Sequence, residues 1–257
     1  MDSRLTGLDL KTSLSALLDL VLPRVCVVCG RTLLPQERHI CLNCLADLPE
    51  THFATLGRNP MADKFNARIA GDNYEPYAYA AALFYYHADS GYAMITQALK
   101  YHRDFGAGKF FARMLGKRLG ESGLFDDVDL IVPVPLHWTR RWTRGYNQAE
   151  VIARELAKAL SAPCRTDILR RGRRTATQTR LTGEEKVANV AGAFQAVAHR
   201  PDRKTASAES GSGVGHILLV DDVFTSGATL AECHKALRKV FGPTVRISVA
   251  ALGYAGD

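Results

Sequence analysis

Two adjacent aspartates, Asp221 and Asp222, stand directly after a run of apolar residues, and small and hydroxyl residues follow them. The apolar run predicts a buried strand, and the apolar spacing after residue 229 predicts a helix. Ligands of open α/β sheets bind at the carboxyl ends of the strands. The two carboxylates and the residues that follow them are therefore expected to line a ligand site.

The segment between this strand and this helix has the composition of a phosphate-binding loop. Its backbone amides and the partial positive charge of the following helix N-terminus favour an anion. It lacks the glycine and lysine pattern of a P-loop, which argues against a nucleoside triphosphatase. Carboxylates repel phosphate but accept hydrogen bonds from sugar hydroxyls, so paired acids before such a loop predict a cradle for a ribose 5-phosphate. The loop residues are Thr225, Ser226, Gly227, Ala228 and Thr229.

Four of the six cysteines form two Cys-x-x-Cys pairs, Cys26 with Cys29 and Cys41 with Cys44. Four thiolates in this pattern suit tetrahedral zinc, and Gly30 permits the tight turn after the first pair. The spacing between the pairs is shorter than in most four-cysteine sites. Disulfides are disfavoured in a reducing compartment, and two copies of the motif disfavour a thioredoxin-like redox pair. The pattern predicts structural zinc with no coordination position left for catalysis.

The length and composition fit one large domain or two small ones, with 257 residues of which 47% are hydrophobic. No apolar run reaches the length of a membrane span. Near the N-terminus, apolar residues at helical spacing favour an amphipathic helix over a signal peptide, so a cytoplasmic location is expected. These apolar residues are Leu10, Leu14, Leu17, Leu18, Val21 and Leu22.

The formal net charge is +7, and the cations cluster in residues 138–146 and 170–180. An excess of this size suits a phosphate-rich ligand or nucleic acid, and it also suits an ordinary solvated surface. Trp138, Trp142 and Tyr146 lie among the first cluster of arginines. Aromatic and cationic side chains in alternation can stack on single-stranded bases, or they can form an amphipathic surface.

Apolar segments alternate with helical patterns along most of the chain, which predicts an α/β fold with a parallel sheet covered on both faces. The polar residues 51–75 are expected to be a linker or an irregular cover, and residues 198–215 a mobile loop. The predicted strands are 128–136, 216–224 and 244–254, and residues 77–86 are predicted to form a strand or a hairpin. The predicted helices are 92–101, 108–122, 146–160 and 229–242.

The stretch "VDDVFTSGAT" resembles the 5-phosphoribosyl-1-pyrophosphate signature of type I phosphoribosyltransferases. The order of the motifs along the chain is similar to that of the ComF/GntX family, over about residues 14–254. These motifs are the cysteine pairs, "ALKYHRDF", "PVPLHWTRRWTRGYNQAE", "RTATQTRLTGEEKVANVAGAF" and "VDDVFTSGAT". This resemblance implies an N-terminal helix and zinc region over 1–60 and a type I phosphoribosyltransferase domain over 75–257. It also implies a link to DNA uptake in natural transformation.

The resemblance assigns roles to individual residues. Asp221 and Asp222 take the ribose 2- and 3-hydroxyls, the following loop takes the 5-phosphate, and Mg²⁺ arrives with the phosphoribosyl pyrophosphate. The pyrophosphate is expected near Arg140, Arg141, Arg144 and Lys100. The arginines also fit an exposed basic helix start, and Lys100 with Tyr101 also fits helix-end packing.

The basic segment 170–190 corresponds to the flexible catalytic loop of related transferases. Arg174, Thr175, Gln178 and Asn189 match family positions, and Lys186 stands where an arginine is expected. Asp221, Asp222, Arg174 and Lys186 are therefore the candidate catalytic residues. The alternative is a disordered basic loop that contacts nucleic acid.

Three functions fit these patterns. The first is an active phosphoribosyltransferase with an unidentified acceptor. The second is a protein of the same fold that binds the ligand without catalysis. The third is a DNA-handling protein whose zinc region and basic loops contact single-stranded DNA or a DNA-uptake helicase. A homodimer is also expected, because proteins of this fold often dimerise.

Overall fold

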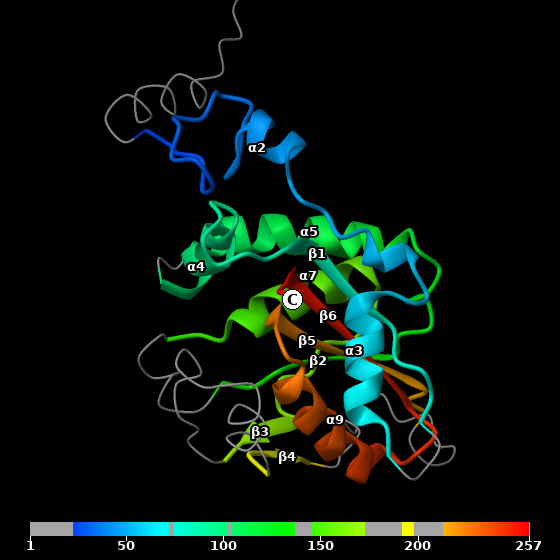
Figure 1. Ribbon diagram of the computed structural model, residues 1–257. Coiled ribbons are helices and arrows are strands. Elements are labelled where there is room, and N and C mark those ends of the chain that lie inside the picture. Colours follow the sequence, from blue (N-terminus) through cyan, green and yellow to red (C-terminus); the bar gives the residue numbers. More distant parts are fainter. Residues whose placement is uncertain are drawn as a thin grey trace, which may run out of the picture.

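The computed structural model describes residues 23–71, 75–101, 104–136, 145–172, 192–197 and 213–256. A four-stranded parallel sheet lies at its centre, in the order β1-β6-β5-β2 (Figure 1). The predicted mixed α/β architecture with a parallel sheet is confirmed. The strands are β1 (Ala80–Tyr85), β2 (Leu130–Pro133), β5 (His216–Phe224) and β6 (Arg246–Tyr254).

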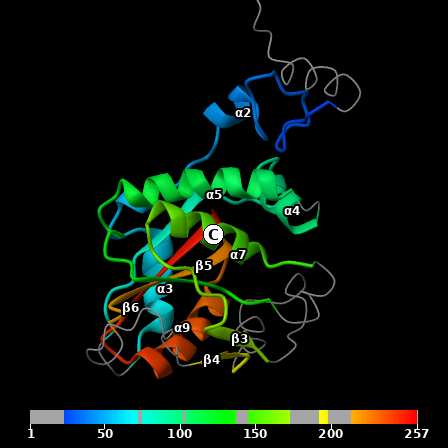
Figure 2. The same cartoon turned by 180° about the vertical axis from the view of Figure 1, so that it is seen from behind.

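Helices cover both faces of this sheet, as its continuous apolar strands require. In β5, Ile217 and Leu219 point into one core and Leu218 and Val220 into the other. The first core is closed by α3 (Pro60–Ile69) and α9 (Ala228–Phe241). The second is closed by α4 (Ala93–Tyr101), α5 (Phe105–Gly120) and α7 (Gln148–Ala159). Figures 1 and 2 show the two helical layers on opposite sides of the strands.

The expectation of a linker over residues 51–75 is wrong, because this region contains a short 3-10 helix, η1 (Phe53–Thr55), and the helix α3. Asn59 caps α3 by accepting a hydrogen bond from the Ala62 amide, and its Nδ2 donates to the Ala80 carbonyl of β1 at 2.9 Å. Met61 and Phe65 are fully buried. The helix was not predicted because its apolar face is short and polar and glycine residues flank it. The Asn-Pro pair at residues 59 and 60 is the sequence signal for its start.

A second, two-stranded antiparallel sheet lies beside α9, and the sequence patterns did not predict it. It pairs β3 (Leu169–Arg171) with β4 (Phe194–Ala196). Both figures place it at the end of the molecule next to α9. The basic segment 170–190 was expected to form a loop, which is wrong for Arg170 and Arg171 because they belong to β3. The rest of that segment from residue 173 lies outside the described residues.

The four-cysteine region, with the short helix α2 (Leu42–Ala46), lies over α4 and α5 (Figure 1). Ile40 and Leu48 belong to the same buried cluster as Phe111 of α5. The Tyr92 hydroxyl donates to the Cys44 carbonyl at 3.1 Å. These contacts join the cysteine region to the helical layer.

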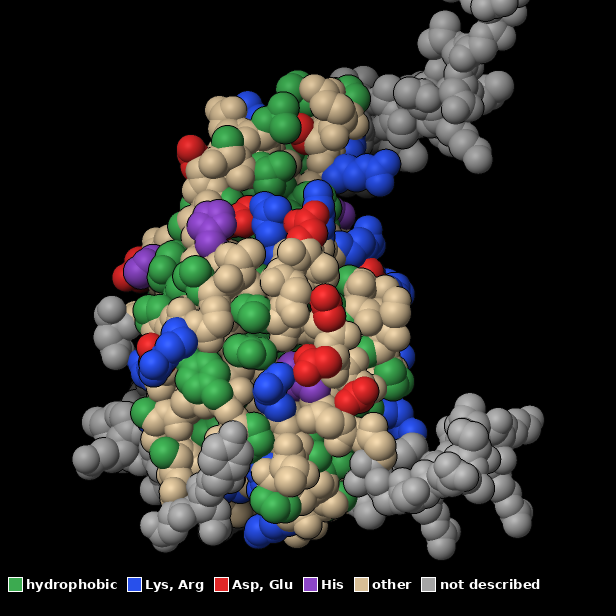
Figure 3. Space-filling view, turned by 90° about the vertical axis from the view of Figure 1, so that its right-hand side faces the viewer, with side chains coloured by type: hydrophobic (Ala, Val, Ile, Leu, Met, Phe, Trp, Pro, Cys, Tyr) green, Lys and Arg blue, Asp and Glu red, His purple; other side chains and the backbone are tan. Residues whose placement is uncertain are grey.

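On the side of the molecule shown in Figure 3, the Lys and Arg side chains of the described residues lie among Asp and Glu side chains. Within the described ranges, no helix combines the length and the apolar character needed to cross a membrane.

Candidate functional site

A pocket of about 200 Å³ lies at the carboxyl ends of β2 and β5. Its lining comes from five parts of the chain that the sheet brings together: the end of β5 with the start of α9, the loop after β2, the start of α7, α4 and β3. Polar atoms make up much of this lining. The residues are Lys100, Val134–Leu136, Asn147–Ala149, Arg171 and 221–230.

The turn from β5 into α9 depends on Gly227. This residue has a φ of +73°, which side-chain-bearing residues rarely adopt. A Cβ at this position would also lie 2.8 Å from the Phe224 ring. Gly227 is the N-cap of α9 and has no side chain to cap the first turn. The residues at the start of α9 line the pocket, so their amides are candidate anion-binding groups.

The N-terminus of a second helix, α7, lies at the same pocket. Its N-cap is Asn147, whose Oδ1 accepts a hydrogen bond from the Ala149 amide at 3.2 Å. The Asn147 Nδ2 donates to the Val134 carbonyl at 2.9 Å, which fixes the start of α7 to the loop after β2. Two helix N-termini therefore contribute partial positive charge to one cavity.

Lys100 and the two aspartates form a charged cluster in the pocket. The Lys100 Nζ lies 2.5 Å from the Asp222 Oδ2. Burial raises the pKa of Asp221 to about 8, and the charge of Asp222 acts in the same direction while Lys100 opposes it. Burial by itself lowers the pKa of Lys100, but the charges of Asp222 and Asp221 outweigh it, so this pKa is raised. The cluster holds two acids beside one cation.

The pocket brings together the candidate ligand-binding residues that the structure describes. Asp221, Asp222, Lys100 and the whole loop 225–229 line it. The remaining candidates, Arg140, Arg141, Arg144, Arg174 and Lys186, lie outside the described residues. Arg171 was not singled out beforehand, because nothing in the basic run 170–180 distinguishes it from its neighbours.

The four paired cysteines form a separate cluster in which all four sulfur atoms lie within 4.8 Å of one another. Four sulfurs at about 2.3 Å from a zinc ion in a tetrahedron are about 3.8 Å apart. The Cys29 and Cys41 sulfurs are 3.8 Å apart. The donor set and this spacing fit, so the cluster could bind a structural metal such as zinc.

A buried carboxylate, Glu37, organises the backbone around this cluster. It accepts hydrogen bonds from the Leu34 amide at 2.7 Å and the Leu42 amide at 2.8 Å, and from Arg31 at 2.9 Å. The hydrogen bond to Leu42 positions the residue that directly follows Cys41. Glu37 has a structural role that the cysteine spacing did not indicate.

The chain is thus a mixed α/β protein with a polar pocket at the carboxyl edge of its parallel sheet and a four-cysteine cluster. No protein-family model matches it. Competence protein F of Haemophilus influenzae is 32% identical over 154 residues, which cover 58% of this chain and 62% of that protein. The DNA utilization protein YhgH of Escherichia coli K12 is 31% identical over 119 residues, 46% of this chain and 47% of that protein. YhgH of Salmonella typhi is 33% identical over a stretch of the same length.

These similarities agree with the resemblance to the ComF family that the order of the motifs indicates. The matched region spans less than two thirds of the Haemophilus protein and about half of each YhgH protein. The names of these relatives refer to competence and DNA utilization.

We expect the substitution Cys41→Ser to lower the zinc content of the purified protein well below a single equivalent, because it removes a thiolate from the cluster. Metal analysis by mass spectrometry measures this content. The matched control is Cys164→Ser, which changes a cysteine outside the cluster and should leave the content unchanged. A wild-type protein that takes up no zinc would contradict the prediction.

We expect the substitution Gly227→Ala to destabilise the protein more than Gly123→Ala. Both glycines have a φ of +73°, but only Gly227 would place a Cβ against a side chain, since Gly123 has open space. Backbone strain should cost about 1–2 kcal/mol at each position, and overpacking should add roughly 1–3 kcal/mol at Gly227. Urea unfolding measures the difference, and equal losses would show that the turn beside Phe224 is looser than described.

Proposed function

We propose that the pocket at the end of β5 binds 5-phosphoribosyl-1-pyrophosphate with Mg²⁺, and that the chain is a phosphoribosyltransferase-type protein. The observation that supports this most is the convergence of Asp221, Asp222 and the start of α9 in one cavity. Carboxylates suit the hydroxyls of a sugar, and the amides of a helix N-terminus suit a phosphate. A ligand that carries both groups a few ångströms apart matches this arrangement.

In this proposal the two aspartates accept hydrogen bonds from the ribose 2- and 3-hydroxyls. The 5-phosphate accepts hydrogen bonds from the amides and hydroxyls of residues 225–229. Charged hydrogen bonds of this kind contribute more than neutral ones. The fit of a ribose phosphate therefore depends on residues that directly follow one another in the chain.

The pyrophosphate part of the ligand needs cations. Lys100 pairs with Asp222, so in this proposal it contacts the aspartates and the pyrophosphate of the ligand. Arg140, Arg141 and Arg144 are proposed to complete the pyrophosphate site on the strength of the sequence resemblance. Arg174 and Lys186 are proposed to act from the basic loop, whose closure would exclude water from a developing oxocarbenium ion.

Mg²⁺ fits the oxygen-rich chemistry of this site, because carboxylate and phosphate oxygens are its preferred ligands. It would be held mainly by ligand oxygens and water, and it would neutralise the charge of a leaving pyrophosphate. The names of the relatives support a cellular role in competence or DNA utilization.

We expect calorimetric titration with phosphoribosyl pyrophosphate and Mg²⁺ to show saturable binding. The double substitution Asp221→Asn, Asp222→Asn should weaken this binding tenfold or more, since each hydrogen bond to a charged group contributes about 1.5–3 kcal/mol. Asp126→Asn, which changes an exposed acid outside the pocket, is the matched control. No binding by the wild type, or equal binding by the double variant, would refute the proposal.

A pyrophosphate-release assay with candidate acceptors then separates an enzyme from a non-catalytic binding protein. Release that is lost in the double variant indicates transfer. Binding without release for any acceptor indicates a sensor or accessory protein.

A second candidate function, binding of single-stranded DNA, is favoured by the outer surface of α5 and α7. Lys109, Arg113 and Lys117 recur every four residues and so share one face of α5. Arg113 and Lys158 of α7 both pair with the buried Glu155, at 2.9 and 2.7 Å, while their own side chains remain 63% and 70% exposed. Glu155 lies beneath these cations, and Lys117 pairs with the exposed Glu121 at 3.7 Å. The exposed cations Lys109, Arg113, Lys117 and Lys158 outnumber this exposed acid, which favours contact with a polyanion.

We expect Lys109→Ala with Lys117→Ala to weaken binding of single-stranded DNA and to reduce its salt dependence, because each lost phosphate contact lowers the slope of log K against log salt by about 0.7. Fluorescence anisotropy at several salt concentrations measures this slope. The matched control is Lys235→Ala with Lys239→Ala on α9. An equal effect of both pairs would show that the binding depends on net charge alone.

A further inference from the structure

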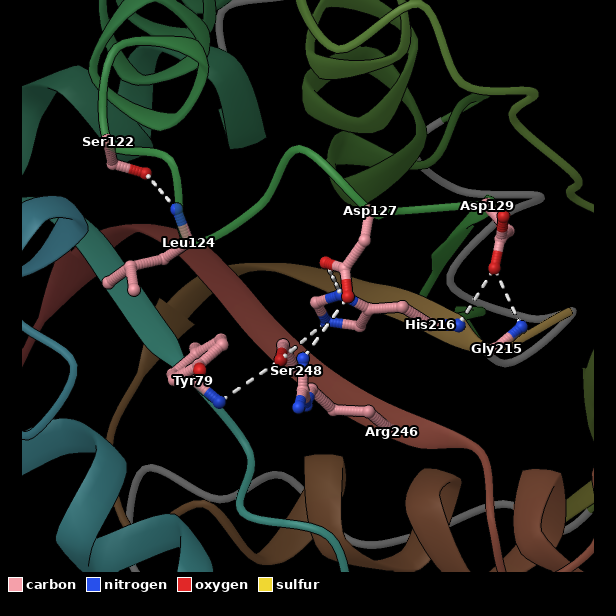
Figure 4. A network of polar contacts seen from close by, with 9 residues as sticks. All are labelled: Tyr79, Ser122, Leu124, Asp127, Asp129, Gly215, His216, Arg246 and Ser248. Atoms are coloured by element: carbon pink, nitrogen blue, oxygen red, sulfur yellow. Dashed lines mark hydrogen bonds and ion pairs between the residues drawn. The ribbon is translucent and has the colours of Figure 1, made fainter.

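A chain of polar contacts lies at the opposite, amino-terminal edge of the sheet, around the buried His216 and Ser248 (Figure 4). The His216 Nδ1 lies 2.7 Å from the Asp127 Oδ1, and the His216 Nε2 lies 2.7 Å from the Ser248 Oγ. The Tyr79 amide donates to the same Ser248 oxygen at 3.0 Å. Arg246 donates to the other oxygen of Asp127 at 3.2 Å.

This chain joins the amino ends of all four strands of the central sheet. Tyr79 directly precedes β1, His216 begins β5, Ser248 lies in β6, and Asp127 lies shortly before β2. Asp129 adds a link, because its Oδ2 accepts hydrogen bonds from the Gly215 amide at 2.6 Å and the His216 amide at 3.0 Å. The network therefore fastens the edge of the sheet that lies away from the ligand pocket.

The order of Asp127, His216 and Ser248 is that of a hydrolytic triad, but the burial excludes this use. Ser248 is fully buried and His216 is only 1% exposed. The Phe125 ring lies over the imidazole at an interplanar angle of 22°, with the Tyr79 ring on an edge. A substrate cannot reach this hydroxyl, so the role of the network is structural.

The contacts fix where each proton lies. The ionised Asp127 carboxylate can only accept, so the proton of the neutral imidazole lies on Nδ1, which donates to Asp127. The His216 Nε2 is then an acceptor for the Ser248 hydroxyl, whose oxygen also accepts from the Tyr79 N–H. A second proton on the imidazole would turn Nε2 from an acceptor into a donor. The buried Ser248 hydroxyl would then lose the acceptor of its proton, which lowers the stability of the folded protein.

We propose that an acid-sensitive contact network, here called the lock, stabilises the amino edge of the sheet only while its imidazole is neutral. The lock consists of His216, Asp127, Ser248 and Arg246. The charged groups that face the imidazole are Asp127 and Asp129 before β2 and Arg246 on β6. Tyr79 and Phe125 present rings to it, and Ser248 presents its hydroxyl.

The electrostatics agree in sign with this geometry. Burial lowers the pKa of His216, Arg246 adds to this, and the carboxylates of Asp127 and Asp129 offset only a part of it. An unfolded histidine has a pKa of about 6.5. Below this pH the unfolded chain binds a proton that the folded chain does not bind until a lower pH, so the lock's contribution to stability is present above about 6.5 and falls on acidification.

The test compares the melting temperatures of the full-length wild type and of His216→Gln at pH 7.5 and 5.5. The wild type should lose a few degrees more than the variant on acidification, because glutamine has no proton to gain. The control is His87→Gln, which changes an exposed histidine outside the network and outside the cysteine cluster and should keep the wild-type loss. Titrating groups other than the two substituted histidines are present in all three proteins, so their effects on the melting temperature cancel in the comparison. An equal loss in the wild type and His216→Gln would overturn the lock.

A second measurement needs no variant at the histidine. Nitrogen-15 NMR of the wild-type imidazole should show the Nδ1–H tautomer persisting below pH 6.5. Titration of His216 at its ordinary pKa, or a neutral Nε2–H tautomer, would overturn the proposal even if His216→Gln does not fold.

Discussion

The parallel pairing of β5 with β2 and β6 is the constraint on which the candidate site depends. In a parallel sheet the carboxyl ends of neighbouring strands meet at one edge, and the helices that follow them begin there. The register aligns Val220 of β5 with Pro133 of β2 and Ala250 of β6. As a result, the acids at the end of β5 lie beside the start of α7 and the start of α9. A slip in this register would separate the groups that form the pocket.

The two edges of the sheet differ in how their buried titratable groups are arranged. At the amino edge, both ring nitrogens of His216 have a hydrogen-bond partner. At the carboxyl edge, two adjacent acids share a pocket with Lys100 and Arg171, and burial raises the pKa of Asp221 to about 8. An arrangement of this kind opposes stability, and such arrangements concentrate at binding and catalytic sites. The contrast supports the carboxyl edge as the place where a ligand is bound.

The sequence predicted those parts of the structure that local patterns determine. The apolar runs gave the four central strands, and the segment 221–229 indicated its own site because its residues are neighbours in the chain. Helix α3 was missed because its short apolar face lies within a polar region. The strands β3 and β4 are three residues each and pair across a long basic segment, so their pairing has no local signal. Arg171 joins the pocket only through that pairing, and Asn147 only through the contact of α7 with β2.

The central claim is that the start of α9 and the adjacent aspartates form one ligand site. The most direct measurement is an amide NMR titration of the isotope-labelled, zinc-loaded protein with phosphoribosyl pyrophosphate and Mg²⁺. The account predicts saturable shifts of the amides of residues 221–229, reproduced at residues 226–229 by ribose 5-phosphate. Shifts confined to the outer surface of α5 and α7, or no shifts at all, would contradict it.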